Sequence, residues 1–525
     1  MDKNNLIKKN GAVLLLLLVV LIAVAGSFVS GLLGMKVGKV NQNKVDHDYE
    51  VLQKAKKALL SYAVNYSFNT NQYAHMGRLP CPDLRITGSS SAGVQDSRCG
   101  SQHANSVGFF PWKTLGIDTL RDSSSECLWY VVSGEYKTGP KAKMRNEDTN
   151  GLLRVQDENG QLYHGTNPSD RPIALIVAPG SILRGQSHAP DCQGNSVETN
   201  YLESDGSVNY KADHTNSADK IWTYVYGTAS SRLKNVDFND KIIWLTKDEY
   251  WNAIKAQNSL DITSTLVKKE VKEEGDSETV KKSEIEQLTA ELTQCFSDYA
   301  NDDKNEHSWL PWPANIEIAD YRHDSKPKKL AHLSGYKDQN NPASLMGRLP
   351  QSISISHMRE LQITDTEIIT HSEKTDIFSI CLNEERKALW RNWKDHYFYA
   401  VSQDFEMVDG SMAALSARCA APGDCLNVST GEGAMVSNKI AAIVFYSSSV
   451  VNGQSRNYPP TDEDEKNSLS NYLDTKSPEI SNAHDYPVDD TYVGNVNTFY
   501  NDIGDLVYCI WVNAEAKALE TGRCV

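Results

Sequence analysis

The chain lacks the sequence fingerprints of common enzyme chemistry. Its 525 residues contain no G-x-S-x-G elbow, P-loop, H-E-x-x-H or dinucleotide-binding glycine pattern. No two cysteines have C-x-x-C spacing, and no histidine pair at helical ligand spacing lies near them, which argues against a zinc site. We therefore expect no catalytic residues, no metal centre and no resident cofactor.

Basic residues are outnumbered by acidic ones, with 53 Lys and Arg against 68 Asp and Glu. The formal net charge is -15 and the pI is about 5.4. A surface that binds nucleic acid or an anionic membrane would need the opposite sign, so both partners are disfavoured. The ten cysteines are an even number and fit an oxidising compartment, where they form disulfides.

The N-terminal region contains one long run without any charge. Residues Ala12 to Met35 are mostly apolar and follow Lys8, Lys9 and Gly11. As a helix they would span roughly 30 Å or slightly more, enough to cross a bilayer core. We expect a retained transmembrane helix. The alternative is a secretory signal that is cleaved after Ala25.

An amphipathic helix is expected directly after this run. No proline occurs before Pro80, and apolar residues recur at close to helical spacing between Lys44 and Phe68. These residues are Val45, Tyr49, Leu52, Ala55, Leu59, Tyr62, Ala63 and Tyr66. The pattern predicts that the hydrophobic helix continues into a helix that packs on a globular head.

These features resemble type IV pilins and the pseudopilins of type II secretion, which begin with a short basic leader ending in glycine. Lys8-Lys9-Asn10-Gly11 followed by Ala12 fits that leader, and cleavage would then separate Gly11 from Ala12. Later segments resemble large pilin-like proteins of Gram-negative bacteria. They are Ala55–Ala63, Gly77-Arg78-Leu79-Pro80-Cys81-Pro82-Asp83, Phe110–Gly116 and Trp129–Ser133.

The resemblance is incomplete in the apolar run. Major pilins have Phe at the first mature position and Glu at the fifth, where this chain has Ala12 and Leu16. Minor pseudopilins at the filament tip also lack the Glu and have enlarged heads. The resemblance implies other pilin or pseudopilin subunits, prepilin peptidase and the inner membrane as partners. It also implies a single-pass inner-membrane protein with periplasmic heads, in a periplasmic or surface filament.

The head sequence is duplicated. Residues 172–187 match 440–455 without a gap, and both segments end in Gly-Gln-Ser. Trp129–Ser133 matches Phe398–Ser402, and Asn200-Tyr201-Leu202 matches Asn471-Tyr472-Leu473. We expect the two copies to superpose, with Ile176 equivalent to Val444 and Tyr130 to Tyr399, because a buried strand fixes which side chains face the core.

A charged stretch separates the copies. It is rich in Lys and Glu and has no aromatic residue, so it predicts a solvated linker. The expected organisation is a leader and transmembrane helix (1–39), a first head (40–262), the linker (263–282) and a second head (283–525). We further expect the second head to fold by itself when the chain is cut near Gly275.

Each head is expected to be α+β, with a helix packed on a mainly antiparallel sheet. The candidate strands are Cys127–Ser133, Ile173–Ala178, Ile242–Leu245, Phe398–Ser402, Ile440–Tyr446 and Leu506–Val512. The second packing helix should run from Ile285 to Tyr299.

Sequence alone does not determine which cysteines pair. The simplest local pairs are Cys81–Cys99, Cys419–Cys425 and Cys509–Cys524, which would leave Cys127–Cys192 and Cys295–Cys381.

Three weaker candidates remain. The Gly-Gln-Ser hydroxyls of Ser187 and Ser455 could be nucleophiles, although a tight turn explains the motif better. The acidic run from Thr461 to Glu465 could bind calcium, although it lacks the ligand alternation of a dedicated loop. The tryptophans 309, 312, 390 and 393 could form a binding patch, although core packing is the simpler interpretation.

Together these features favour a minor, tip-type pilin-like subunit with a structural or assembly role. The alternative is a membrane-anchored periplasmic or surface adhesin that binds a ligand. A membrane-tethered hydrolase has only the two serine hydroxyls in its favour.

Overall fold

The computed structural model describes most of both heads. The described residues are 39–70, 77–84, 92–97, 99–100, 104–138, 146–188, 197–203, 221–226, 232–233, 236–258, 283–303, 305, 307–314, 316, 345–354, 374–406, 414–419, 425–451, 453–457, 463–483, 498–501, 504–513, 515 and 517–524.

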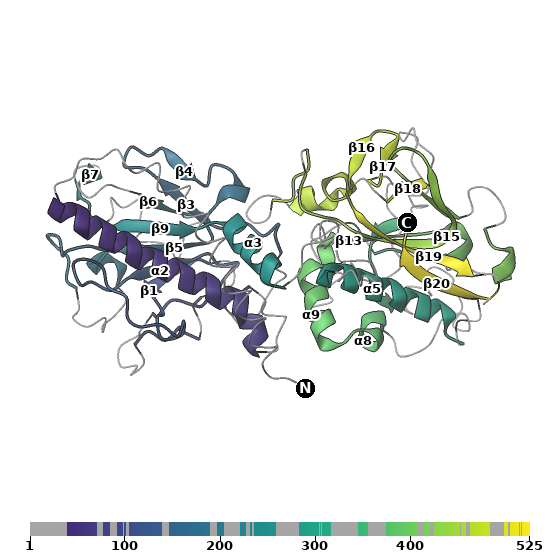
Figure 1. Ribbon diagram of the computed structural model, residues 1–525, viewed down its shortest axis with the longest axis horizontal. Helices are drawn as coiled ribbons and strands as arrows, with labels where there is room; N and C mark the ends of the chain where they lie inside the picture. The colour runs from purple at the N-terminus through teal and green to yellow at the C-terminus, as the bar shows by residue number, and fades with distance from the viewer. Residues whose placement is uncertain are drawn as a thin grey trace, which may run out of the picture. The chain divides into compact units, whose positions relative to one another are not determined.

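The first half of the chain contains helices at its two ends and strands between them (Figure 1). The helices are α2 (Lys39–Thr70) and α3 (Lys247–Asn258). The strands are β1 (Ser106–Phe109), β2 (Trp129–Val132), β3 (Leu153–Gln156), β4 (Leu162–His164), β5 (Ala174–Ala178), β6 (Trp222–Val225), β7 (Arg232–Leu233), β8 (Val236–Asp237) and β9 (Lys241–Leu245).

Strand alternation divides the first half into three layers. The main sheet has the antiparallel order β1-β2-β5-β9, and a smaller sheet has the order β4-β3-β6. Tyr130 and Ile176 share a core with Leu59 of α2, whereas Trp129 and Leu175 share a second core with the strands of the smaller sheet. Because successive side chains point to opposite faces, the main sheet lies between the helix and the smaller sheet.

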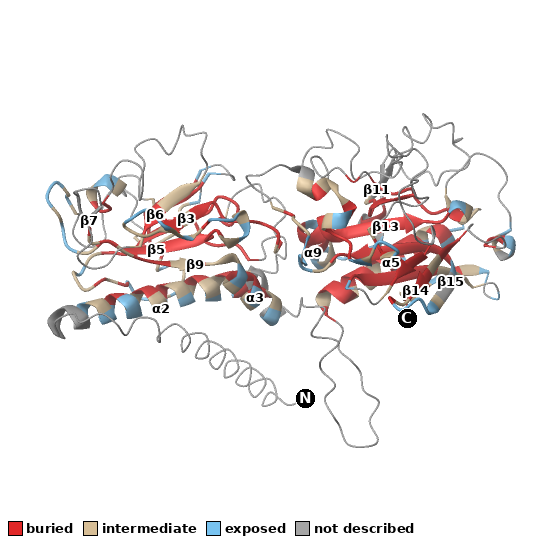
Figure 2. Cartoon of the chain, turned by 90° about the horizontal axis from the view of Figure 1, so that it is seen from above, coloured by how far each residue is buried: buried red, intermediate tan, exposed pale blue. Residues whose placement is uncertain are grey.

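The second half has the same central plan with more strands. Its helices are α5 (Glu284–Asn301), α8 (Ile377–Cys381) and α9 (Glu384–Trp393). Its strands are β10 (Met346–Arg348), β11 (Ser352–Ser354), β12 (Lys374–Asp376), β13 (Tyr397–Val401), β14 (Leu426–Ser429), β15 (Met435–Tyr446), β16 (Thr475–Ser477), β17 (Ile480–Ser481), β18 (Thr498–Tyr500), β19 (Leu506–Asn513) and β20 (Ala518–Arg523). Figure 2 shows that the buried residues gather in the central strands and on the helix faces against them.

The central strands of the two halves have the same pairing. Tyr130 pairs with Ile176 and Ile176 with Ile243, and likewise Tyr399 pairs with Val444 and Val444 with Tyr508. The expected equivalence of Ile176 with Val444 and of Tyr130 with Tyr399 therefore agrees with the observed register. The proposed domain boundaries at 40–262 and 283–525 remain predictions.

The predicted fold class, which included an N-terminal transmembrane helix, is wrong for the described residues. Among the described residues, no helix is both long and apolar enough to cross a bilayer. The longest helix, α2, has 32 residues, but charged residues such as Lys44, Asp46 and Lys57 interrupt its apolar character. The fold is mixed helix and sheet, mostly sheet, and the single-pass inner-membrane location is not retained. The predicted anchor from Ala12 to Met35 lies outside the described residues.

The packing helices agree with the sequence pattern. In α2, Leu52, Ala55, Leu59 and Ala63 are buried while Lys54 is exposed, as expected for an amphipathic helix. In α5, the Ser283 hydroxyl accepts a hydrogen bond from the Glu286 amide and caps the N-terminus. The four tryptophans 309, 312, 390 and 393 are all buried, which supports core packing over a binding patch.

Candidate functional site

The Gly-Gln-Ser motif forms the same turn in both halves. The backbone N–H of Gln186 donates to the Leu183 carbonyl at 3.1 Å, and the backbone N–H of Gln454 donates to the Val451 carbonyl at 3.1 Å. The glycine before each glutamine has a positive φ, +98° at Gly185 and +92° at Gly453. That conformation favours glycine, which explains why the motif begins with it.

The glutamine side chain clamps each turn from within. Its carbonyl oxygen accepts from the amide of the residue that starts the turn, Leu183 at 2.8 Å and Val451 at 3.2 Å. We name residues 183–186 and 451–454 with these bonds the glutamine-clamped turns. The motif thus forms a tight turn in both halves, which is the interpretation that the sequence favours. The Ser455 hydroxyl donates to Glu465 at 2.6 Å.

Each glutamine also reaches a buried acid. Gln186 Nε2 donates to Glu203 Oε1 at 2.7 Å, and Gln454 Nε2 lies 3.3 Å from Asp474 Oδ1. The acid follows the repeated Asn-Tyr-Leu in both halves. The clamp therefore connects a surface turn to the interior.

A second acid lies next to the first in both halves. The Glu203 amide donates to Asp240 Oδ2 at 3.1 Å, and the Asp474 amide donates to Asp505 Oδ2 at 2.9 Å. Asp240 and Asp505 stand immediately before β9 and β19, the strands that pair with β5 and β15. The sheet topology thus brings together acids that are about 30 to 40 residues apart in the sequence.

Burial changes the acidity of these pairs. It raises the pKa of Glu203 and of Asp474 above their ordinary values. Burial, with the neighbouring Asp474 carboxylate as the next cause, raises the pKa of Asp505 to about 8. Two carboxyl groups this close in an apolar interior favour sharing a proton, because both cannot be ionised cheaply.

A cluster of buried charges connects the two halves. Asp148 of the first half lies 3.1 Å from His396 Nε2, 3.6 Å from Arg456 Nη1 and 3.8 Å from Lys466 Nζ of the second. Lys466 also pairs with Asp395 at 3.0 Å. All five side chains are buried to at least 99%. We call these five residues the junction cluster.

The junction cluster is electrostatically balanced. Burial alone would raise the pKa of Asp148, but Arg456, His396 and Lys466 together hold that pKa well below its usual range. Asn146 adds a hydrogen bond to Asp395 Oδ1 at 2.6 Å. Because each acid is matched by a cation and closed off from solvent, the cluster can stabilise the contact between the halves, but no substrate can approach it.

Asp148, Asp395 and His396 are close enough to hold a metal ion. Their surroundings do not fit one. The Lys466 ammonium already lies against both carboxylates, and His396 Nδ1 donates to the Ser447 carbonyl at 2.9 Å. A divalent ion would have to displace a buried ammonium, so the arrangement is that of an ion-pair network.

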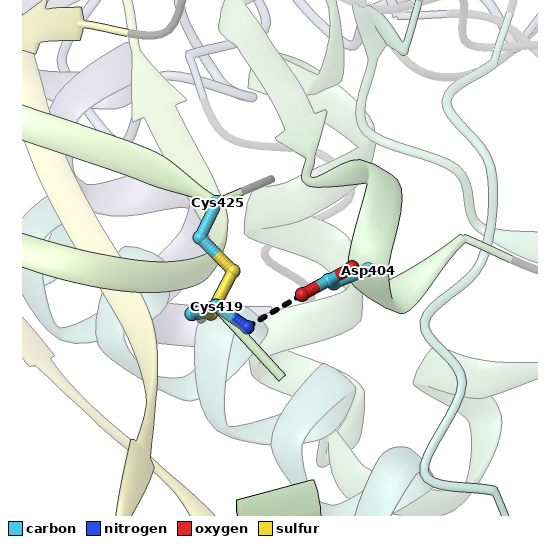
Figure 3. Close-up of side chains that lie close together, drawn as sticks. All are labelled: Asp404, Cys419 and Cys425. Atoms are coloured by element: carbon cyan, nitrogen blue, oxygen red, sulfur yellow. Dashed lines mark hydrogen bonds between the residues drawn. A yellow bond between two sulfur atoms is a disulfide. The ribbon is translucent and has the colours of Figure 1, made fainter. Parts of the chain in front are cut away.

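A second candidate group contains Asp404, Cys419 and Cys425 (Figure 3). The two cysteines are joined by a disulfide, so neither offers a thiolate to a metal. An oxygen of Asp404 accepts a hydrogen bond from the Cys419 amide. Cys419 has a φ of +59°, and this bond holds its backbone in that conformation.

The disulfides agree with the pairs expected from the sequence. Cys81 is joined to Cys99, Cys295 to Cys381, Cys419 to Cys425 and Cys509 to Cys524. Cys127 is disulfide-bonded as well, while its expected partner Cys192 lies outside the described residues. The predicted cleavage pair Gly11 and Ala12 also lies outside them.

In the described part of the acidic run proposed for calcium, Glu465 accepts hydrogen bonds from other residues of the protein. Glu465 accepts from the Ser455 hydroxyl and from the Asn457 amide at 2.8 Å. Thr461 and Asp462 lie outside the described residues. This gives Glu465 a structural role at the base of the second glutamine-clamped turn.

Sequence reasoning missed the clamp and the junction cluster for different reasons. The repeated glutamine and the acid after each Asn-Tyr-Leu were visible in the sequence and could have suggested the clamp. The junction cluster has no repeat signal, because Asp148 and Arg456 come from different halves. The chain matches no family model, no curated protein and no solved structure.

Proposed function

We propose that this chain is a structural subunit of a type IV pilus or type II secretion-like filament, in the manner of a large minor pilin. The observation that carries the proposal is a helix laid along an antiparallel sheet, present twice. Leu52, Leu59 and Ala63 of α2 share a core with the main sheet, and α5 does the same with Leu288, Leu292 and Phe296. This is the arrangement that the resemblance to pilins implies.

The lack of an evident catalytic arrangement supports the same proposal. The acids of the junction cluster are paired and buried, and a pocket lined by Asp83 and Trp112 holds about 10 Å³. That volume is about one water molecule, far too small for a substrate. A scaffold that makes contacts through its surface fits these features better than an enzyme does.

The experiment is deletion of the encoding gene, followed by counting filaments and measuring secretion of a filament-dependent protein. We expect loss or shortening of filaments, restoration by the full chain, and detection of the chain in purified filaments with its mature N-terminus at Ala12. A mature start at Gly26, or normal filaments that contain none of this chain, would contradict the proposal.

A second function is favoured by one specific observation. Exposed aliphatic side chains stand in or directly before the glutamine-clamped turns of both halves, at Ile182, Val450 and Val451. Such paired surface features suit an adhesin or another ligand-binding protein. Deletion that leaves filaments intact but abolishes adhesion to a surface would favour this function over the first.

A further inference from the structure

We propose that the junction cluster and Asn146 form a self-modification site, in which the Lys466 amine condenses with the Asn146 side-chain amide and releases ammonia. The product is an isopeptide bond that joins the two halves of the chain covalently. The inference goes beyond the proposed function, because the reaction happens once within the chain, turns over no substrate and does not depend on what the protein assembles with.

One carboxyl group holds both reacting side chains. Asp395 Oδ2 lies 3.0 Å from Lys466 Nζ, and Asp395 Oδ1 accepts a hydrogen bond from Asn146 Nδ2 at 2.6 Å. The amine and the amide are thus neighbours across Asp395, although they come from different halves. The lysine stem is flexible, so a change of rotamer can bring Nζ onto the amide carbon. Holding two reactants side by side removes most of the entropic cost of bringing them together.

The hydrogen bonds of Asn146 orient and polarise its amide. Nδ2 donates to the Asn392 carbonyl at 3.0 Å as well as to Asp395, and Oδ1 accepts from the backbone N–H of Asp148 at 3.1 Å. These three contacts agree on which terminal atom is nitrogen and which is oxygen. An N–H that points at Oδ1 stabilises the negative charge that develops there when an amine attacks Cγ.

The reaction needs a proton relay between two nitrogens, and Asp395 contacts both. Its carboxylate first takes a proton from the Lys466 ammonium, which leaves a neutral amine as the nucleophile. The Nζ lone pair forms a bond to Cγ of Asn146, and the carbonyl electrons move to Oδ1. As the carbonyl re-forms, the bond between Cγ and Nδ2 breaks. Asp395 gives its proton to Nδ2, which leaves as ammonia, and takes the second proton of Nζ, so this acid ends neutral.

Water is excluded from the site. Asn146, Asp395 and Lys466 are each 0% exposed. Such an interior favours a neutral amine and a neutral acid over two separate charges, and it keeps water from competing with the amine for the amide carbon. The product replaces a buried ammonium by a neutral amide. Asp148 then keeps Arg456 Nη1, 3.6 Å away, as its cation, so the remaining charges stay matched.

The test is mass spectrometry of the full chain, purified from the cells that produce it, reduced and digested with trypsin. Trypsin does not cleave after an acylated lysine. We therefore expect one branched peptide that joins residues 146–154 to residues 457–476 and is lighter than the sum of the two by one ammonia molecule. Lys56, which lies 2.7 Å from Glu249 at a partly exposed site, is the matched control and should be cleaved normally.

Variants assign the role of each residue. Lys466→Arg keeps the positive charge but has no amine to acylate, and Asn146→Ala has no side-chain amide, so both should give none of the branched peptide. Asp395→Asn removes the proton relay at nearly the same size, and its yield of branched peptide should fall about tenfold or more. Asp148→Asn keeps the backbone N–H but removes the carboxylate 3.8 Å from Lys466, so its yield should fall less. Circular dichroism checks that each variant is folded.

The digest of the wild-type chain decides by itself, even if a variant does not fold. Ordinary cleavage after Lys466, without a branched peptide, would overturn the inference and leave the cluster as an ion-pair network. A branched peptide lighter by one water molecule would also contradict it, because a carboxyl group would then be the acceptor in place of Asn146. A folded Asp395→Asn variant with the wild-type yield would rule out the proton relay that the reaction requires.

Discussion

At the scale of single residues, buried acids of this chain have neighbours of opposite charge: some lie beside cations and others beside a second acid. Asp148 is surrounded by cations, which lower its pKa, whereas Asp505 has another acid beside it, and its pKa is raised. Both side chains are buried. The neighbours therefore decide whether a buried carboxyl is ionised at neutral pH.

This contrast predicts a specific effect of pH on Asp505. Its folded-state pKa lies above its unfolded-state value, so its contribution to stability is complete below about pH 4 and is lost as pH rises toward about 8. Asp505→Asn keeps a neutral side chain that can accept the same two hydrogen bonds. We expect this variant to lose less stability than wild type between pH 5 and pH 8, by on the order of 2 kcal/mol, measured by urea unfolding.

A matched control for Asp505→Asn is Glu515→Gln, which removes an exposed acid. It should keep the pH dependence of the wild type. An unchanged pH dependence in Asp505→Asn itself would show that Asp505 is ionised in the folded protein.

The opposite sign applies to Asp148. Its pKa is lowered on folding, so it stabilises the protein above the unfolded-state value and less as pH falls. Asp148→Asn leaves Arg456 and Lys466 without their shared carboxylate. We expect a loss of about 3–5 kcal/mol of unfolding free energy at pH 7. Asp118→Asn, an exposed acid, should change stability by less than about 0.5 kcal/mol, and a similar value for Asp148→Asn would be incompatible with a buried ion pair.

At the scale of elements, the disulfides connect segments whose separation along the chain differs widely. Cys295–Cys381 joins α5 to α8 across a sequence separation of 86, whereas Cys419 and Cys425 are only 6 residues apart in the sequence. Loop-closure entropy grows with the logarithm of loop length, so the longer loop restricts the unfolded chain more.

This difference predicts the cost of removing each bridge. Replacing Cys295 and Cys381 by Ala should lower the unfolding free energy by about 4 kcal/mol, and replacing Cys419 and Cys425 by about 2 kcal/mol. Denaturant unfolding of the two double variants measures both. An equal or reversed order would mean that local packing outweighs chain entropy at these bridges.

At the scale of the whole molecule, the two copies are joined by more than the linker. Residues of the junction cluster come from both halves, and Trp251 of α3 packs edge-on against Trp393 of α9 with ring centroids 5.7 Å apart. These contacts hold the two halves together, and the expectation that the second half folds by itself stays a prediction. The unit from Val51 to Val525 is compact as a whole.

Proteolysis in the linker tests this directly. A protease site introduced near Gly275 should give two fragments that still elute together from a size-exclusion column at pH 7. The same cut in the Asp148→Asn variant should release them more readily, because the cations of the second half then lose their partner. If the cut wild-type chain instead releases a stable second half, the two heads fold independently.

Much of each head could be predicted from sequence because the signals are local. The 3.6-residue spacing of Leu52, Ala55, Leu59 and Ala63 predicted the face of α2 that is buried, and the matched strands predicted the shared register of Ile176 and Val444. The glycine in each Gly-Gln-Ser predicted a turn, since that residue alone tolerates the backbone angle easily.

Only the tertiary structure decided which distant side chains meet. Gln186 and Glu203, or Asp148 and Arg456, are polar residues that carry no periodic signal, and their contacts arise because strand order and packing bring separate segments together. The tertiary structure also decided that α2 is a packing helix with one buried face, although its length of 32 residues alone would allow it to span a membrane. Periodicity is a property of neighbouring residues, whereas pairing of buried charges is a property of the assembled fold.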